Sequence, residues 1–490
     1  MKKLLLILAG LMLIFSLAAC SQDNEGAMPE EETQTEGTIT IKVVNKDDTT
    51  TNPVSVTYFE SLEQALKEDE GLDVKFELID LTQGNYAERL NLLLGGGNIP
   101  DLIYFQGGDL QVSQQGVLED LTPYIENSTY LKDIMEPHNI ERVKNYPYLL
   151  WVKPLAQRTP VIRADWFNEL ETSSALMDNP TVETYFEFFK EVVEKKPGGS
   201  KPGYAITTAG DIGELDMIFN MAFGINQTWM EKADGTYEYS KISQNEKDKL
   251  EFYSKLYQEG LLDPQFVTKQ WDTKEKAFYD GDAAVVVGTA GKVIDIYNGK
   301  MTQVNGAEAE LVALPPAKGE YQGFGATDVI KESRGFAIFS QSPYKDTVFQ
   351  ILDYMASPNG QMLDRLGFEG EHYNIVDGEI ELTEKYYNEW FARFWEPSAF
   401  EPEMELKTPL LGETAERSLE LLQEFYTEDN IFLIPDQYVT NWDAMNNLYV
   451  EFATDIVSGK IGIDAFDTFV EEWKRAGGDQ ITEYANEYLN

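Results

Sequence analysis

The order of strand-like and helix-like segments that follows residue 37 constrains the fold more than any other feature. Alternating apolar and polar residues at 38–44 and 74–78 predict half-buried strands, and helical apolar spacing marks 59–66 and 86–94. The apolar run 102–105 predicts a third, more deeply buried strand. This βαβαβ order indicates an α/β fold with an open, mostly parallel sheet and helices on both faces.

Ligands of such sheets bind beyond the carboxyl ends of the strands. Here those ends are expected at 45–48 and 106–109. We therefore predict ligand contacts from Asn45, Gln106 and Asp109, with Asp109 as the main acceptor for hydroxyl groups. The alternative for each is an exposed loop residue or a core residue without a role in binding.

About 450 residues follow the N-terminal segment, which is too many for one ordinary core, so we expect two lobes. A second α/β unit is expected from Trp151, with a crossing strand at 160–162 and a buried strand at 283–287. From about residue 342 the chain is mostly helical, and a buried stripe is predicted where Phe466, Phe469 and Trp473 recur. We assign 38–150 plus about 280–333 to an N-terminal lobe, and 151–279 plus about 334–490 to a C-terminal lobe.

Residues 1–19 have the order of a secretory signal peptide. Lys2 and Lys3 precede an apolar run at 4–15, and small residues follow. The run is short for a membrane-spanning helix, which needs about 20 residues, although an uncut N-terminal anchor is the alternative.

Cys20 is the only cysteine, so the chain forms no intramolecular disulfide. The stretch 17–20, Leu-Ala-Ala-Cys, resembles a bacterial lipobox, which implies that the Cys20 sulfur receives a diacylglyceryl group and becomes the new N-terminus. Residues 21–37 hold six acidic and no basic side chains, a composition that does not fold. Residues 20–37 are therefore expected to be a lipid-anchored acidic tether.

The formal net charge of −46 argues against nucleic acid and anionic lipid surfaces as partners, because both require basic patches. The same charge disfavours a polyanionic ligand, although a local basic pocket would override the average.

The sequence lacks the motifs of an enzyme. It contains no phosphate-binding glycine loop, no HExxH, no GxSxG and no CxxC, and only two histidines, His138 and His372. No calcium-binding Asp-x-Asp-x-Asp-Gly loop is present, and 85 acidic residues make carboxylate pairs uninformative. We therefore expect neither catalysis nor a cofactor or metal ion.

Aromatic side chains near expected loops and crossings are the remaining candidates for binding. A sugar site combines aromatic platforms for the apolar C–H faces with polar groups for the hydroxyls. We predict that Trp271 is the main stacking platform, although any single Trp can instead be core. The further ligand-binding candidates from the crossing and the second lobe are Trp151, Arg158, Trp229 and Trp395.

Four stretches together resemble the extracellular solute-binding proteins of family 1, the lipoprotein components of sugar ABC importers. They are a helix, turn and Pro-Asp at 89–101, the segment LYQEGLLDP at 256–264, a motif at 367–378, and the tail at 459–479. The resemblance spans nearly the whole chain.

This resemblance implies a class II fold of two α/β lobes, joined by strands that cross twice, with an oligosaccharide or sugar derivative held in the cleft. It also implies hinge closure, delivery to the permease subunits of an ABC importer, and a monomer anchored at the outer face of the cell membrane. Two alternatives stay open: a surface glycan hydrolase, and a receptor that serves a sensor kinase.

The chain departs from many family members after the first helix of the second lobe. There, relatives carry an Asp/Asn-rich loop shaped like an EF-hand, whereas residues 194–201 read Glu-Lys-Lys-Pro-Gly-Gly-Ser-Lys. Because lysines replace carboxylates, we predict that no calcium binds there.

Overall fold

The computed structural model describes residues 37–46, 48–81, 86–97, 99–155, 158–327, 334–400, 402 and 404–490. The predicted signal peptide, Cys20 and all of the predicted tether except Gly37 lie outside these residues. In the described part of the chain, no helix combines the length and the apolar character that crossing a membrane requires.

The first sheet has the strand order β11-β3-β1-β2. β1 (Ile39–Val44) pairs in parallel with β2 (Val74–Leu78) and β3 (Leu102–Gln106), while β11 (Arg334–Ile338) pairs with β3 in the opposite direction. The connecting helices are α1 (Pro53–Asp69) and α2 (Tyr86–Gly95). The predicted βαβαβ unit is thus confirmed.

The second sheet has the order β5-β8-β4-β9. β5 (Tyr204–Ile206) and β8 (Ala283–Thr289) are parallel, and β4 (Arg158–Arg163) runs opposite to both β8 and β9 (Leu311–Ala313). In each sheet, therefore, three strands share a direction and one is reversed. The reversed strand lies at the margin of the first sheet but inside the second, so the expected mostly parallel arrangement holds less well for the second sheet.

The assignment of 280–333 to the N-terminal lobe is wrong. β8 and β9 belong to the second sheet, and β11 belongs to the first. β8 is buried along nearly its whole length, and its apolar side chains need β4 and β5 on either side and helices above and below. Its local sequence specifies a buried strand but not which strands it pairs with.

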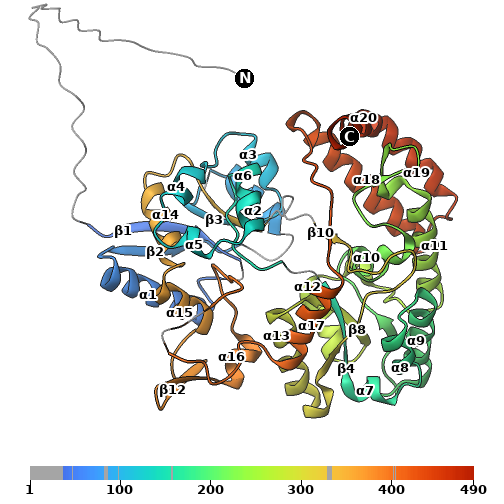
Figure 1. The fold of residues 1–490 in the computed structure, drawn as a ribbon, viewed down its shortest axis with the longest axis horizontal. Helices are drawn as coiled ribbons and strands as arrows, with labels where there is room; N and C mark the ends of the chain where they lie inside the picture. Colours follow the sequence, from blue (N-terminus) through green and yellow to red (C-terminus); the bar gives the residue numbers. More distant parts are fainter. Residues whose placement is uncertain are drawn as a thin grey trace, which may run out of the picture. The chain divides into compact units, whose positions relative to one another are not determined.

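We call the region built on the first sheet the N-lobe. Besides α1 and α2, it contains the hairpin β12 (Tyr373–Val376) and β13 (Glu379–Leu382). Helices α14 and α15 lie beside α1 and the first sheet, although they are far away in the sequence (Figure 1). Its other helices are α3 (Asp109–Ser113), α4 (Thr122–Glu126), α5 (Leu131–Ile134), α6 (Pro137–Asn145), α14 (Lys345–Tyr354), α15 (Pro358–Leu366) and α16 (Glu384–Glu389).

We call the region built on the second sheet the C-lobe. It includes the hairpin β6 (Trp229–Glu231) and β7 (Tyr237–Tyr239), and the short pair β10 (Ala326–Thr327) and β14 (Thr427–Glu428). Its helices are α7 (Ala164–Glu169), α8 (Ser173–Asp178), α9 (Val182–Lys195), α10 (Gly213–Phe219), α11 (Gln244–Gln258), α12 (Trp271–Tyr279), α13 (Lys292–Asn305), α17 (Glu413–Glu424), α18 (Val439–Val457), α19 (Ala465–Trp473) and α20 (Asp479–Leu489).

The chain passes between the lobes three times, not twice as the resemblance implied. The first two passages lie between β3 and β4 and between β9 and β11. The third follows α16, because Leu410 packs against the N-lobe core whereas Leu411 packs against a C-lobe core. The helical C-terminal part is therefore divided between the two lobes.

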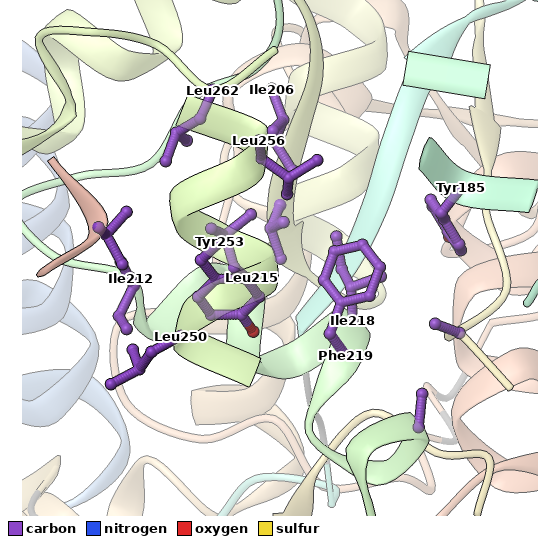
Figure 2. Packing of buried hydrophobic residues seen from close by; sticks show 14 of the residues in the cluster. Tyr185, Ile206, Ile212, Leu215, Ile218, Phe219, Leu250, Tyr253, Leu256 and Leu262 are labelled. Carbon is purple, nitrogen blue, oxygen red and sulfur yellow. The ribbon is translucent and has the colours of Figure 1, made fainter. Parts of the chain in front are cut away.

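Each lobe has its own apolar core. In the C-lobe, one side of α10 interleaves with one side of α11 (Figure 2). The interleaved side chains are Leu215, Ile218 and Phe219 of α10 and Leu250, Tyr253 and Leu256 of α11. This packing fixes the position of α10, whose first turn carries Glu214 of the candidate site.

Candidate functional site

Both reversed strands begin with an arginine at the carboxyl end of their sheet. Arg158 opens β4 opposite Thr289, the last residue of β8. Arg334 opens β11 opposite Gln106, the last residue of β3. A reversed strand that has just crossed from the other lobe therefore places its first side chain where a ligand of an α/β sheet is expected.

Arg158 and Trp271, which the sequence suggested separately, lie together in the C-lobe. The guanidinium of Arg158 lies 5.7 Å from the centre of the Trp271 ring. Both side chains are accessible, with exposed fractions of 44% for Arg158 and 40% for Trp271. An exposed indole at the end of a sheet offers a flat apolar face to a ligand.

A buried ion pair supports this platform. Nζ of Lys274 lies 2.5 Å from Oε1 of Glu214 and 3.5 Å from the centre of the Trp271 ring. Burial raises the pKa of Glu214 and lowers that of Lys274, and each charge offsets the effect on its partner. The pair fixes α12 against α10, and so fixes the orientation of the Trp271 indole.

Two carboxylates, those of Glu214 and Asp211, lie near Arg158. Oε1 of Glu214 lies 4.0 Å from Nη1 of Arg158, and Oε2 of Glu214 is buried without a hydrogen bond to any described residue. Asp211, in the loop that follows β5, accepts a hydrogen bond from the Gly213 backbone N–H at 2.7 Å. Burial raises the pKa of Asp211. These groups offer hydrogen-bond acceptors beside the exposed Arg158–Trp271 pair.

The N-lobe carries a related pair. The guanidinium of Arg334 lies 4.5 Å from the centre of the Trp151 ring, and Trp151 is half-buried. The backbone around this pair is fixed, because Nη2 of Arg142 donates to the Arg334 carbonyl at 2.8 Å and Nδ2 of Asn139 donates to the Trp151 carbonyl at 3.1 Å. Gln106 and Trp151 are thus brought together through Arg334, which the sequence interpretation missed.

Asn45 and Asp109 lie at the predicted strand ends but are buried, with exposed fractions of 6% and 3%. Nδ2 of Asn45 donates to Asp48 at 2.9 Å, and Oδ1 accepts from the Lys46 backbone N–H at 2.9 Å. Burial and the nearby Asp109 carboxylate raise the pKa of Tyr146. Both side chains are therefore engaged inside the N-lobe, and their position supports a role in shaping the loops rather than in direct contact.

Trp229 and Trp395 are not ligand platforms in this structure, because both are fully buried. Trp229 packs in the C-lobe core, with Tyr239 and Phe432 at 5.4 and 5.3 Å between ring centres. Trp395 packs in the N-lobe core and donates its indole N–H to the Leu352 carbonyl at 2.9 Å. Both follow loops in the sequence, but the apolar area of a Trp favours burial wherever neighbouring elements enclose it.

Besides Arg334, the sequence interpretation missed Asp211, Glu214 and Lys274. One signal was available for Arg334, since it stands at the start of a strand that follows a crossing, as Arg158 does. No local signal distinguished Glu214 from the many other acidic residues. Within the described residues, no cluster of His, Cys, Asp and Glu has the arrangement of a metal site.

A model of the bacterial extracellular solute-binding protein family matches residues 53–362. The chain is 22% identical to the lipoprotein LipO of Bacillus subtilis over 86% of this chain and 87% of that protein. It is 21% identical to the polygalacturonan/rhamnogalacturonan-binding protein YtcQ of the same organism over 86% of each chain.

The fold is also similar to that of the Streptococcus pneumoniae ABC-transporter substrate-binding protein FusA, solved as an EF-hand mutant with fructo-nystose. The TM-score is 0.65 at 14% identity, over 92% of this chain and 98% of that chain. Because the family model covers more than half of the sequence, the chain belongs to the bacterial extracellular solute-binding proteins.

Proposed function

We propose that this protein is a membrane-anchored extracellular receptor that captures an oligosaccharide or sugar derivative and delivers it to an ABC importer. The observation that carries the proposal is the exposed Arg158–Trp271 pair at the carboxyl end of the second sheet. An aromatic face next to hydrogen-bonding groups matches the two kinds of surface that a sugar presents. The names of YtcQ and FusA support this class of ligand and, for FusA, the link to a transporter.

The Arg334–Trp151 pair supplies the matching surface of the N-lobe in this proposal. A ligand held between the two carboxyl ends would favour a closed form, by as much as it binds that form more tightly than the open one. Hydrogen bonds between described residues already connect the lobes. Nε2 of Gln111 in α3 donates to Asp443 in α18 at 3.0 Å, and Nζ of Lys292 in α13 donates to the Tyr386 carbonyl in α16 at 3.0 Å.

Cys20 would attach the protein to the outer face of the cell membrane, with residues 20–37 as the tether, and the closed form would be presented to permease subunits as a monomer. No catalytic step is part of the proposal. Glu214 is 3% exposed and paired with Lys274, so it is not placed to act on a scissile bond. The same binding geometry would serve a sensor kinase, and the two uses differ only in the partner that recognises the closed form.

A thermal-shift experiment with a panel of oligosaccharides tests the proposal. Residues 39–490 form one compact unit, so a chain that begins at Ser21 retains every described element. A ligand at 100 times its Kd should stabilise the protein by about 2.7 kcal/mol and be recovered uncut. Peptides that stabilise the protein while no sugar does would overturn the proposal, and recovery of cleaved sugar would favour a hydrolase.

The Trp271→Ala variant tests whether the sugar binds on the Trp271 ring or elsewhere on the protein. We expect it to weaken sugar binding by about tenfold or more without lowering the melting temperature of the unliganded protein. Tyr488→Ala is the matched control, because Tyr488 is also an exposed aromatic residue, 55% exposed on α20. Equal affinity of both variants would show that Trp271 is not part of the site.

A further inference from the structure

Four arginines of the described chain lie over tryptophan rings, and their carboxylate partners differ. Arg163 and Arg393 are each bound by a carboxylate of the protein. Arg163 is held by Asp165 through two hydrogen bonds of 2.6 and 2.5 Å, and Nε of Arg393 donates to Asp48 at 3.0 Å. The four pairs are Arg158–Trp271, Arg163–Trp166, Arg334–Trp151 and Arg393–Trp390.

Arg158 and Arg163 stand at opposite ends of β4 and allow a direct comparison. The Arg163 guanidinium stacks on Trp166 at 4.6 Å, and its side chain is 10% exposed. Asp165 occupies its two parallel N–H donors, the usual bidentate arrangement of guanidinium and carboxylate. At the last residue of β4, therefore, the guanidinium has both a tryptophan ring and a bidentate carboxylate as partners.

At the first residue of β4, Arg158 has only a more distant carboxylate, that of the buried Glu214. The Arg158 side chain makes no hydrogen bond with any described residue, and the Glu214 carboxylate oxygen is 4.0 Å from its Nη1. That oxygen is held by Lys274 at 2.5 Å. Because Glu214 and Lys274 are both buried, a molecule that arrives from solvent meets Arg158 and Trp271 before it meets either of them.

We propose that the Arg158 guanidinium receives the carboxylate of a uronic acid residue in the ligand, while the Trp271 ring covers a face of the same sugar. This inference rests on the proposed function and specifies its ligand as an acidic oligosaccharide. A planar guanidinium presents paired donors that match a planar carboxylate. Arg158 is thus an exposed positive charge that the overall charge of −46 conceals.

The surrounding charges are consistent with one acidic group at this position. Lys274 and Glu214 neutralise each other below the platform. Asp211 is the remaining carboxylate nearby, and its Oδ1 already accepts from the Gly213 backbone N–H. A ligand carboxylate would therefore meet Arg158 as the exposed cation of this group, since Lys274 is buried and already paired with Glu214.

Isothermal titration with matched ligands tests this inference. The probes are trisaccharides of galacturonate, glucuronate and mannuronate, each as the free acid and as the uncharged methyl ester. One of the acids should bind at least about tenfold more tightly than its ester, the contribution expected of a hydrogen bond between charged groups. A neutral trisaccharide of the same length should bind no more tightly than the ester, because it offers no anion to Arg158.

The variant Arg158→Gln should bind the acid no more tightly than the ester. Arg158→Lys, which keeps the charge but not the paired donors, should retain only part of the preference. Arg417→Gln removes the same charge from an exposed ion pair on α17 and should keep the full preference. The melting temperature of each unliganded variant checks that it is folded, and Arg158→Lys serves as the test if Arg158→Gln is not.

The outcomes separate this inference from the proposed function. Equal binding of acid and ester, or a preference that persists in Arg158→Gln, overturns the inference alone. Binding of a neutral oligosaccharide with no binding of any acid does the same. If no oligosaccharide binds, the proposed function fails and the inference fails with it.

Discussion

The two lobes bury carboxylates in different ways. In the C-lobe, Asp216 of α10 is paired with two lysines, Lys241 and Lys249, each at 2.7 Å. In the N-lobe, Asp364 of α15 has no lysine or arginine at ion-pair distance among the described residues. It accepts hydrogen bonds from the Tyr58 hydroxyl at 2.6 Å and from three backbone N–H groups at 2.8 to 3.0 Å.

The difference follows from what surrounds each carboxylate. Asp216 lies among helices, whose backbone N–H groups are already used, so side chains of α11 and the segment before it must compensate its charge. Asp364 faces the extended segment 393–395, whose N–H groups have no helical partners and point to it. The C-lobe network therefore depends on charge, and the N-lobe network depends on hydrogen-bond geometry.

The largest expected effect comes from breaking the charge network. Lys249→Met removes the ammonium that lies 2.9 Å from Glu246 and 2.7 Å from Asp216, and all three groups are buried. Leaving carboxylates under-compensated inside the C-lobe should lower the free energy of unfolding by about 3–5 kcal/mol, measured by denaturant titration. Lys276→Met, which breaks an exposed pair with Asp280, should leave the free energy of unfolding nearly unchanged. Similar losses for the two variants would contradict the assigned role of Lys249.

A smaller effect is expected from Asp364→Asn in the N-lobe. The amide can turn its oxygen toward the N–H groups of Phe394 and Trp395, and its NH₂ toward the Tyr58 hydroxyl, which can accept. The backbone N–H of Arg393 is then left without an acceptor, which should cost about 1–3 kcal/mol. Asp364→Ala, which removes all the acceptors, should cost clearly more in the same denaturation assay. Equal losses would show that the hydrogen bonds of Asp364 contribute little.

The charge network around Asp216 should make the stability of the protein depend on pH. Burial alone would raise the pKa of Asp216, but Lys241 and Lys249 outweigh it and lower the pKa to about 2 from the ordinary value of 3.8. A lowered folded-state pKa gives stability that is present above about pH 4 and is lost as the pH falls toward 2. The loss should reach about 2 kcal/mol.

Free energies of unfolding measured from pH 6 to pH 2 in wild type and Asp216→Asn check this expectation. The variant should be less stable at pH 6, and its curve should fall less steeply below pH 4 than the wild-type curve. Parallel curves would mean that Asp216 titrates at its ordinary pKa in the folded protein.

The smallest expected effect concerns calcium. The C-lobe loop at 194–201 contains a single carboxylate, and its Lys201 pairs with Asp282 at 3.1 Å. We expect millimolar calcium to leave the melting temperature unchanged. A calcium-dependent rise that disappears in Glu194→Gln would show that this loop binds the ion after all.

The sequence alone identified much of the fold. Its apolar periodicity located β1, β2, β3, α1 and α2, the strands β4 and β8, and the stripe of Phe466, Phe469 and Trp473 that is buried in the C-lobe core. These features depend on neighbours within a few residues, because the apolar repeat of a helix or a strand spans only two to four residues. The motifs along the chain also indicated the family, which the family model confirms.

Part of the candidate site was also accessible from sequence. Strand ends and crossings pointed to Gln106, Trp151, Arg158 and Trp271, all of which lie at a carboxyl end of one of the two sheets or next to it. The same reasoning failed for Trp229 and Trp395, because a loop-like sequence does not reveal which distant elements pack over it. Whether a tryptophan is a platform or core depends on elements distant along the chain.

The tertiary structure decided the pairings that no local pattern contains. It placed β8 beside β4 rather than in the first sheet, and it brought β11 back to β3, so that Arg334 meets Trp151. It also gave Arg163 a bidentate carboxylate partner in Asp165, whereas the Glu214 carboxylate lies 4.0 Å from Arg158. Local sequence sets the period of each strand and helix, but the free energy that selects their neighbours comes from burying apolar area and satisfying charges across segments far apart in the chain.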